Sequence, residues 1–253
     1  MKRVYFRFYE ELNDFLSIER IKVEFEHEFW GIVAVKDMIQ SFGVPHTEID
    51  LILVNGTSVG FDYIVNDLDR FSVYPVFESF DIGYLQKLRS EPLRNPKFIL
   101  DVHLGKLARS MRLMGFDTLY KNTFNDEEIV TISNEQKRTI LTRDLGILKR
   151  NMVDRGYWLR NTDPKKQILE VLKRFHLLNE INEFSRCISC NGLLMKIEKS
   201  TVENFVPLKV FNFYEKFYAC SDCKKIYWKG SHYREMKNKV SIIKQNVKRV
   251  YDE

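Results

Sequence analysis

Two successive patterns of apolar and polar positions run along the chain. Residues 4–9 are rich in aromatic and β-branched side chains, and residues 21–26 alternate apolar with charged ones, so both segments are predicted strands. A short helix is expected at 35–42, where Gly43 follows. Residues 51–54 and 71–76 predict two further strands, and an Asn-Gly pair directly after the first of them is a strong hairpin-turn signal.

The second pattern begins after a linker expected at 90–96, which contains two prolines. Strands are predicted at 97–102, 118–120, 139–142 and 157–160. Helices are predicted at 104–114, from 125, at 145–152 and from 163 to about 175. Alternating strands and helices imply a parallel sheet covered by helices, which is the α/β class of fold.

Charge divides the chain near this linker. Residues 1–92 contain 9 Lys and Arg against 16 Asp and Glu, a net charge of −7, whereas residues 93–253 contain 31 against 19, a net charge of +12. A basic second part favours an anionic partner, and nucleic acid is the commonest one. The alternative is a lysine-rich surface that is only solvated.

The composition is that of a globular protein, with 44% apolar and 30% charged residues. No stretch approaches the roughly 18 apolar residues of a membrane span. Arg7, Glu10 and Glu11 interrupt the N-terminal segment too early for the apolar core of a signal peptide. We therefore expect a cytoplasmic protein that has no membrane partner.

Four aspartates are expected at one edge of the predicted sheet. Asp101 and Asp144 follow two of its strands, and Asp126 and Asp163 open two of its helices. The carboxyl ends of parallel strands meet at the edge where ligands bind. Two unit charges about 4 Å apart repel by about 4 kcal/mol at an effective dielectric constant near 20, so such a cluster implies a bound cation. Oxygen ligands favour Mg²⁺ or Mn²⁺, and these ions catalyse phosphodiester hydrolysis.

Each aspartate also has a simpler explanation. Asp126 suits the positive end of a helix in its first turn, and Asp163 before a proline is a typical helix cap. Asp101 and Asp144 are harder to explain in this way, because a carboxylate after an apolar run needs a partner. A salt bridge to a neighbouring arginine would provide one.

Two Cys-x-x-Cys pairs lie in the last third of the chain: Cys187 with Cys190, and Cys220 with Cys223. In a reducing compartment, two such pairs indicate one tetrahedral zinc ion held by four thiolates. All four ligands then come from the protein, so the zinc is structural rather than catalytic. The arrangement resembles a zinc ribbon, and a redox dithiol is the alternative.

Basic and aromatic side chains alternate after the second cysteine pair. In single-stranded nucleic acid, lysines contact phosphates and aromatic rings stack on bases. The candidates for such contacts are Lys224, Lys225, Tyr227, Trp228 and His232. The alternative is that Tyr227 and Trp228 pack the core of the ribbon while His232 lies on the surface. Residues 240–251 have amphipathic helical spacing, and they either pack on the body or extend the basic surface.

The order of elements in residues 1–90 resembles the ubiquitin-like β-grasp fold. The sulfur carriers of that fold act through a free C-terminal Gly-Gly, whereas this segment continues into another domain without one. Carrier chemistry is therefore excluded, and we expect a scaffold or a unit that docks a protein partner.

Residues 101–118, DVHLGKLARSMRLMGFDT, resemble the opening of the Mut-seven-C ribonuclease domain, a member of the PIN-like nuclease superfamily. NDEE at 125–128, LTRD at 141–144, both cysteine pairs and YWKGSH at 227–232 are similar to later parts of that family. The resemblance implies a PIN-like sheet whose acids bind Mg²⁺ or Mn²⁺ and cut RNA. By position, the metal-binding acids would be Asp101, Asp126 and Asp144. Asp163 is a further catalytic candidate, and Arg143 would orient a phosphate or an acid.

These observations predict a ubiquitin-like β-grasp domain at 1–90, a PIN-like nuclease domain at 97–180, a zinc ribbon at 184–236 and a basic C-terminal helix or tail at 237–253. The predicted function is that of a metal-dependent ribonuclease with structural Zn²⁺ and catalytic Mg²⁺ or Mn²⁺. Its partner would be single-stranded RNA, contacted also by Arg109 and Arg112. The alternatives are a catalytically inactive RNA-binding adaptor, whose acids would bind no divalent metal, and a nuclease that cuts DNA.

Overall fold

The computed structural model describes residues 1–75 and 97–251, which form two compact units. The first unit contains residues 1–75 and 142–158, and the second contains residues 97–141 and 159–251. The linker expected at 90–96 lies outside the described residues. The chain therefore returns to the first unit for one short segment in the middle of the predicted nuclease domain.

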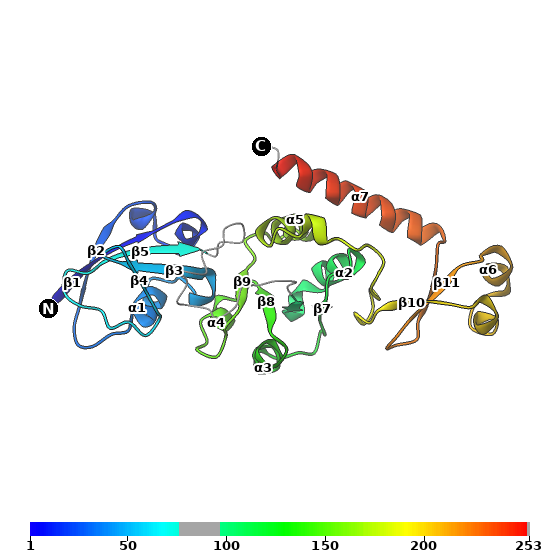
Figure 1. The fold of residues 1–253 in the computed structure, drawn as a ribbon, viewed down its shortest axis with the longest axis horizontal. Coiled ribbons are helices and arrows are strands. Elements are labelled where there is room, and N and C mark those ends of the chain that lie inside the picture. The colour runs from blue at the N-terminus through cyan, green and yellow to red at the C-terminus, as the bar shows by residue number, and fades with distance from the viewer. Residues whose placement is uncertain (76–96, 252–253) are drawn as a thin grey trace. The chain divides into compact units, whose positions relative to one another are not determined.

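A five-stranded mixed sheet forms most of the first unit (Figure 1). Its strands, in the order β2-β1-β5-β3-β4, are β1 (Lys2–Phe8), β2 (Phe25–Phe29), β3 (Ile49–Val54), β4 (Thr57–Val59) and β5 (Arg70–Pro75). β1 and β5 are parallel, and the other pairs are antiparallel. The helical elements of residues 1–75 are η1 (Glu10–Phe15), η2 (Ile18–Arg20), α1 (Val35–Ser41) and η3 (His46–Glu48). This arrangement confirms the β-grasp prediction.

Aromatic side chains between α1 and the sheet form the core of this domain. Phe6 and Phe71 stack with their ring centroids 4.4 Å apart, and Phe42 meets Phe6 edge-on. Burial of each such ring stabilises the fold by about 1.5–3 kcal/mol. The Asn55-Gly56 turn also forms as expected, because both residues have the positive φ angles, 50° and 86°, that such hairpin turns require.

Strand β2 begins four residues later than the alternation at 21–26 predicts. Lys22 has a φ angle of 59°, and its N–H donates to Asn13 Oδ1 at 2.7 Å, so the chain turns there. Pairing with β1 places Phe25 opposite Phe6, whereas Ile21 and Val23 are exposed. The apolar pattern at 21–26 was therefore misleading, because the turn at Lys22 sets the start of the strand.

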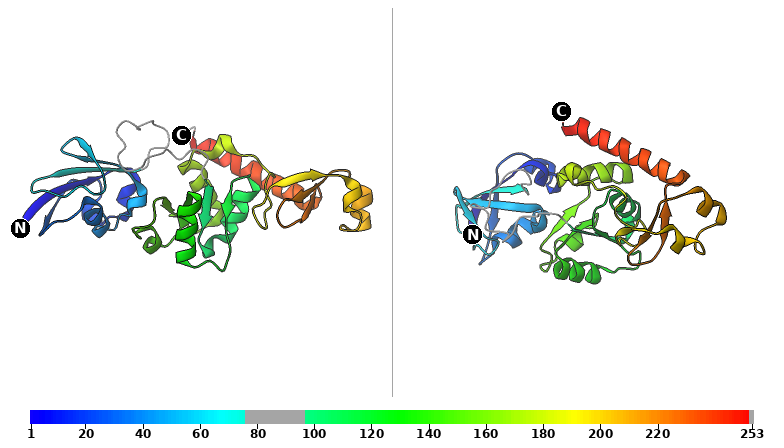
Figure 2. Two further views of the ribbon diagram at one scale, coloured as in Figure 1. Left: turned by 60° about the horizontal axis from the view of Figure 1, so that its bottom comes forward. Right: turned by 45° about the vertical axis from the view of Figure 1, so that its right-hand side comes forward.

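A parallel sheet confirms the predicted α/β fold of the second part of the chain. Its strand order is β7-β6-β8-β9. The strands are β6 (Lys97–Leu100), β7 (Thr118–Leu119), β8 (Arg138–Thr142) and β9 (Gly156–Trp158), and β6 is parallel to both of its neighbours. The helical elements are η4 (Val102–Leu104), α2 (Gly105–Leu113), α3 (Asp126–Gln136), α4 (Leu145–Leu148), α5 (Pro164–Arg174) and η5 (Leu177–Glu180). Helices α3 and α5 lie on opposite sides of this sheet (Figures 1 and 2).

A three-stranded antiparallel sheet forms the cysteine-containing part of the second unit. Its strands are β10 (Leu194–Ile197), β11 (Phe217–Cys220) and β12 (Ile226–Trp228). The connection between β10 and β11 contains η6 (Lys199–Val202) and α6 (Leu208–Phe213), which no pattern in the sequence predicted. Val202, Val206 and Phe217 form the small apolar core of this ribbon.

The last helix, α7 (Ser231–Tyr251), begins nine residues before the segment predicted from its amphipathic spacing. It contacts α5, and Val240 and Val247 are buried, so its apolar side packs on the body. None of the helices in the described ranges, α7 included, is both long enough and apolar enough to cross a membrane. The cytoplasmic location stays a prediction.

Candidate metal and nucleic-acid sites

The four cysteines converge at one end of the ribbon sheet. Their sulfur atoms all lie within 4.8 Å of one another. The distance is 3.7 Å between Cys187 and Cys223, and it is 3.3 Å between Cys190 and Cys220. Disulfide sulfurs are about 2.05 Å apart, and all four thiols here are free. A tetrahedral zinc with Zn–S bonds of about 2.3 Å needs sulfurs about 3.8 Å apart, so the cluster fits Zn²⁺.

Both cysteine pairs have the same backbone conformation, which explains their convergence. In each pair, the carbonyl of the first cysteine accepts from the N–H four residues later, that of Asn191 at 2.9 Å or Lys224 at 3.2 Å. The N–H of the first cysteine donates to the carbonyl five residues later, at 2.7 Å for Cys187 and at 3.0 Å for Cys220. Asn191 and Lys224 have φ angles of 81° and 60°. Two equivalent tight turns therefore present their sulfurs to one point.

Hydrogen bonds to sulfur favour the thiolate form that zinc requires. The Tyr227 hydroxyl lies 3.0 Å from Cys187 Sγ, and the N–H of Asp222 donates to Cys220 Sγ at 3.4 Å. Burial raises the pKa of Cys187, but the bonds from Tyr227 and from backbone N–H groups outweigh it and lower the pKa to about 6. Burial raises the pKa of Cys190 to about 12. A cation bound between the four sulfurs would stabilise their thiolate forms.

The two aromatic residues expected to stack on RNA have packing roles in the ribbon. Tyr227 reaches Cys187, and Trp228 packs against the apolar core that includes Phe217. Both are half-buried. These contacts correspond to the alternative in which Tyr227 and Trp228 pack the ribbon.

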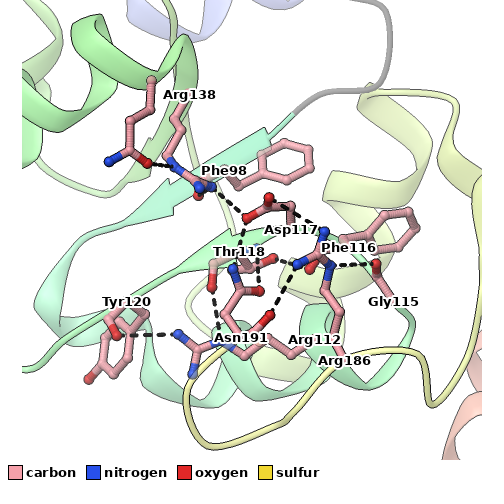
Figure 3. A network of polar contacts seen from close by, with 11 residues as sticks. Phe98, Arg112, Gly115, Phe116, Asp117, Thr118, Tyr120, Arg138, Arg186 and Asn191 are labelled. Atoms are coloured by element: carbon pink, nitrogen blue, oxygen red, sulfur yellow. Dashed lines mark hydrogen bonds and ion pairs between the residues drawn. The ribbon is translucent and has the colours of Figure 1, made fainter. Parts of the chain in front are cut away.

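Arg112, also expected to contact RNA, is 2% exposed and belongs to a buried polar network (Figure 3). Its Nε donates to the carbonyl of Thr118 at 2.8 Å, and Nη2 donates to that of Tyr120 at 3.2 Å. Nη1 donates to the carbonyls of Ile188 at 3.3 Å and Ser189 at 2.9 Å, the two residues inside the first cysteine pair. Every guanidinium nitrogen therefore donates to the protein's own backbone, and this burial and bonding argue against the expected RNA contact of Arg112.

Asp117 and Asn191 extend this network across the same boundary. Asp117 Oδ1 accepts from Arg138 at 2.7 Å and from Asn191 at 2.8 Å, and its Oδ2 lies 3.4 Å from Arg186. Asn191 Oδ1 accepts from the N–H of Thr118 at 2.9 Å. Burial raises the pKa of Asp117, but the bonds from Arg138 and Asn191 outweigh it and leave the pKa below its ordinary value. The network ties the first cysteine loop to β7 and α2.

Two of the predicted acids lie in the second unit. Asp101 directly follows β6 and is 8% exposed, and its N–H donates to the Leu141 carbonyl at 3.1 Å. Asp126 is the first residue of α3 and lies within the capping box that Asn125 and Glu128 form. The sequence placed both residues correctly at the end of a strand and the start of a helix.

The other two predicted acids cap helices. Asp163 Oδ1 accepts from the N–H of Lys165 at 2.9 Å, which confirms the helix-cap alternative. Asp144 Oδ1 accepts from the N–H of Gly146 at 2.7 Å at the start of α4. Asp144 and its neighbour Arg143 are exposed and belong to the first unit. Among the described residues, the four cysteines are the one group of three or more ligands close enough to hold a metal. The three-aspartate site therefore stays a prediction.

Exposed basic side chains gather at the end of the ribbon and on α7. Lys224, Lys225, Lys229 and His232 are exposed. Helix α7 contains six Lys and Arg against one Glu, and its exposed cations include Arg234, Lys237 and Lys239. Arg109 is also exposed on α2. This distribution favours an anionic partner for the second unit.

Two family models match the chain. Residues 96–240 match the Mut7-C RNAse domain, and residues 1–81 match the Mut7-C ubiquitin domain. The first match covers more than half of the chain, which therefore belongs to the Mut7-C RNAse family. Both matches confirm the resemblance identified from residues 101–118 and the order of the two domains. Searches of curated proteins and of solved structures found no match.

Sequence reasoning missed two groups of residues that organise these sites. One is the network of Arg112, Asp117 and Asn191, and the other is the set of polar side chains around η3 in the first unit. The only signal for Arg112 was its place between apolar positions of the 104–114 helix. Asn191 stands between Cys190 and Gly192, which indicates only a turn, and nothing in its neighbourhood indicates a bond to Asp117, 74 positions away.

Proposed function

We propose that the chain is a metal-dependent ribonuclease. The observation that carries this proposal is the match of residues 96–240 to an RNAse domain. The parallel sheet supports it, because ligand sites in such sheets lie beyond the carboxyl ends of the strands. Asp101 occupies that position directly after β6, a strand with partners on both sides.

Asp101, Asp126 and Asp144 would hold Mg²⁺ or Mn²⁺, since carboxylate oxygens are the ligands these ions prefer. Such an ion, when bound, polarises a phosphate and lowers the pKa of water. The chain's own contribution is to fix the ligands. The backbone N–H of Asp101 donates to the Leu141 carbonyl of β8. Arg143 beside Asp144 is exposed, and it would orient a phosphate oxygen. We assign Asp163 to helix capping alone.

The four-cysteine cluster is proposed to hold a structural zinc ion, and the basic surface is proposed to bind single-stranded RNA. Zinc would fix the ribbon, while Lys224, Lys225 and His232 would contact phosphates with Arg109 of α2. Exposed apolar side chains on the ubiquitin-like domain, such as Trp30 and Ile32, are candidate contacts for a protein partner.

The test is cleavage of end-labelled single-stranded RNA and DNA with Mn²⁺, with Mg²⁺ and with EDTA. Wild type is compared with Asp101→Asn, Asp144→Asn and Asp163→Asn, and Glu127→Gln is the control, since it removes an exposed acid next to Asp126. We expect RNA cutting that EDTA abolishes. The first two variants should lose about 100-fold or more of the cutting rate, the order of effect of removing one group that stabilises transition-state charge. Asp163→Asn and Glu127→Gln should cut like wild type.

The outcomes separate the alternatives. Metal-dependent cutting that survives both Asp101→Asn and Asp144→Asn contradicts the proposed site. Intact RNA binding without any cutting makes the chain an adaptor. Equal cutting of RNA and DNA would show a nuclease that does not recognise the 2′-hydroxyl.

A further inference from the structure

The segment that carries Arg143 and Asp144 is held by the ubiquitin-like domain. Residues 96–240 match one RNAse domain, yet residues 142–158 belong to the same compact unit as residues 1–75. This segment contains α4 and β9. A contact surface inside the first unit therefore joins the β-grasp domain to a piece of the RNAse domain.

One corner of the β-grasp domain makes this contact through η3, whose residues His46, Thr47 and Glu48 are all buried. His46 Nδ1 lies 2.8 Å from Gln40 Nε2, and His46 Nε2 lies 2.7 Å from the carbonyl oxygen of Val153. The Gln40 amide nitrogen is a donor, so Nδ1 accepts and Nε2 donates its proton to Val153. The imidazole thereby contacts the backbone of the 142–158 segment at Val153.

Gln40 makes a second bond to the same segment. Its Nε2 also donates to the carbonyl of Lys149 at 3.1 Å. Lys149 is the C-terminal cap residue of α4, where carbonyls lack partners within the helix. A helix of one turn cannot stabilise itself in water. The β-grasp domain thus satisfies backbone groups that the segment leaves open at Lys149 and Val153.

Two hydrogen bonds connect Glu48, through Trp158, to the residue before Asp144. Glu48 is 0% exposed, and its Oε1 accepts from the backbone N–H of Trp158 at 2.6 Å. The indole Nε1 of Trp158 donates to the carbonyl of Arg143 at 3.2 Å. That carbonyl belongs to the peptide bond directly before Asp144. The Phe15 ring lies 5.3 Å from the indole and supports it from the β-grasp side.

We propose that the ubiquitin-like domain is an internal positioning element, and that Gln40, His46 and Glu48 fix the loop that presents Arg143 and Asp144. These are positioning residues, since each acts through the backbone or through Trp158. The expected effect on RNA cutting rests on the proposed nuclease function. That the ubiquitin-like domain holds the loop rests only on the contacts within the first unit.

The test uses the full chain and two matched variants of buried carboxylates. Glu48→Ala removes the acceptor for Trp158, and Asp69→Ala removes an acceptor for Asn55 and Tyr63 within the same domain. Hydrogen exchange measured by mass spectrometry should be about tenfold faster in peptides covering 143–158 of Glu48→Ala, the size expected for one lost hydrogen bond. Asp69→Ala should accelerate exchange near 55–70 and leave 143–158 unchanged.

Gln40→Met provides a second variant if Glu48→Ala does not fold. It keeps a similar volume and removes both donors, to His46 and to Lys149. We expect faster exchange at 143–158 from this variant too. Unchanged exchange in a folded Gln40→Met or Glu48→Ala protein overturns the proposal.

Cleavage assays supply a second readout. A displaced Asp144 should lower the cutting rate on the order of 10- to 100-fold and raise the Mn²⁺ concentration needed for half-maximal rate, whereas RNA affinity stays at the wild-type value. Asp69→Ala should show neither change. If wild type itself cuts no RNA, the proposed function fails, while the exchange experiment still decides whether the β-grasp domain holds the segment. Faster exchange with an unchanged metal requirement contradicts the positioning role.

Discussion

Individual polar side chains in the second unit hold backbone groups and sulfur atoms in place. Arg112 donates to backbone carbonyls on both sides of the boundary between the α/β domain and the ribbon, such as those of Thr118 and Ser189. A buried guanidinium needs several acceptors to offset its desolvation, and carbonyls supply them without a second charge. Tyr227 acts similarly on Cys187.

Tyr227→Phe should weaken zinc binding. The substitution removes the hydroxyl 3.0 Å from Cys187 Sγ and leaves the ring in place. Loss of a partner to a metal ligand costs about 10- to 100-fold in affinity, and competition with a chromophoric chelator measures it. Tyr218→Phe is the control, because Tyr218 lies opposite Tyr227 on the neighbouring strand. Equal zinc affinities in the two variants would contradict a role for the hydroxyl.

Asp117→Asn should destabilise the protein at neutral pH and not in strong acid. The pKa of Asp117 is lower in the folded protein than its ordinary value, so the charged form stabilises the fold above about pH 4 and this stabilisation is lost as pH falls through the folded value. Removing one partner of a buried ion pair costs about 3 kcal/mol.

Urea unfolding of both proteins at several pH values measures this difference. Glu127→Gln, which alters an exposed acid, should stay within about 0.5 kcal/mol of wild type throughout. A deficit in Asp117→Asn that is as large at pH 3 as at pH 7 would show that the charge of Asp117 is not its cause.

At the scale of elements, α7 combines a packing side with a charged side. Val240 and Val247 are buried, while Arg234, Lys237 and Lys239 are exposed. The exposed cations continue from Lys224 and Lys225 of the ribbon. The apolar side of α7 is already covered by the protein, and its exposed basic side is suited to contact a phosphate backbone.

Replacing Arg234, Lys237 and Lys239 with Gln should lower the affinity for RNA. It should also make that affinity less sensitive to the salt concentration. Each phosphate contact contributes about 0.7 to the slope of log affinity against log salt for single strands, so the slope should fall by about 2. Fluorescence anisotropy with labelled RNA at several salt concentrations measures it. The control variant carries Gln in place of three exposed cations of the first unit, Arg3, Arg7 and Lys22. An unchanged slope would exclude α7 from the interface.

At the scale of the whole molecule, each unit joins two parts of the chain. In the second unit, the Arg112 network joins the ribbon to α2 and β7. In the first unit, η3 joins the ubiquitin-like domain to the 142–158 segment, which lies within the range that matches the RNAse domain.

Zinc removal should loosen more than the ribbon. The carbonyls of Ile188 and Ser189 lie inside the first cysteine pair, so a disordered loop would leave Arg112 without two of its acceptors. We expect a strong chelator to accelerate hydrogen exchange in the ribbon and also in α2 and β7, with no change in β1–β5. Exchange changes confined to 187–228 would contradict coupling through Arg112.

Short-range patterns determined much of this protein from the sequence. The parallel strands, the Asn55-Gly56 hairpin and the cap at Asp163 depend on residues close together along the chain, so local periodicity and turn chemistry suffice to predict them. The Cys-x-x-Cys pairs are equally local, and the need of one zinc ion for four ligands predicted that the two pairs converge. Family-specific segments such as residues 101–118 identified the RNAse domain.

Tertiary structure alone decided which side chains are available to a ligand. Arg112 and Tyr227 have the residue types of RNA contacts, yet burial next to carbonyls and sulfur commits them to the fold. The bonds that Gln40 donates to Lys149 and that Glu48 accepts from Trp158 join positions more than 100 residues apart. No period or motif encodes such pairs, because they depend on how separately folded elements meet and not on the local preference of either segment.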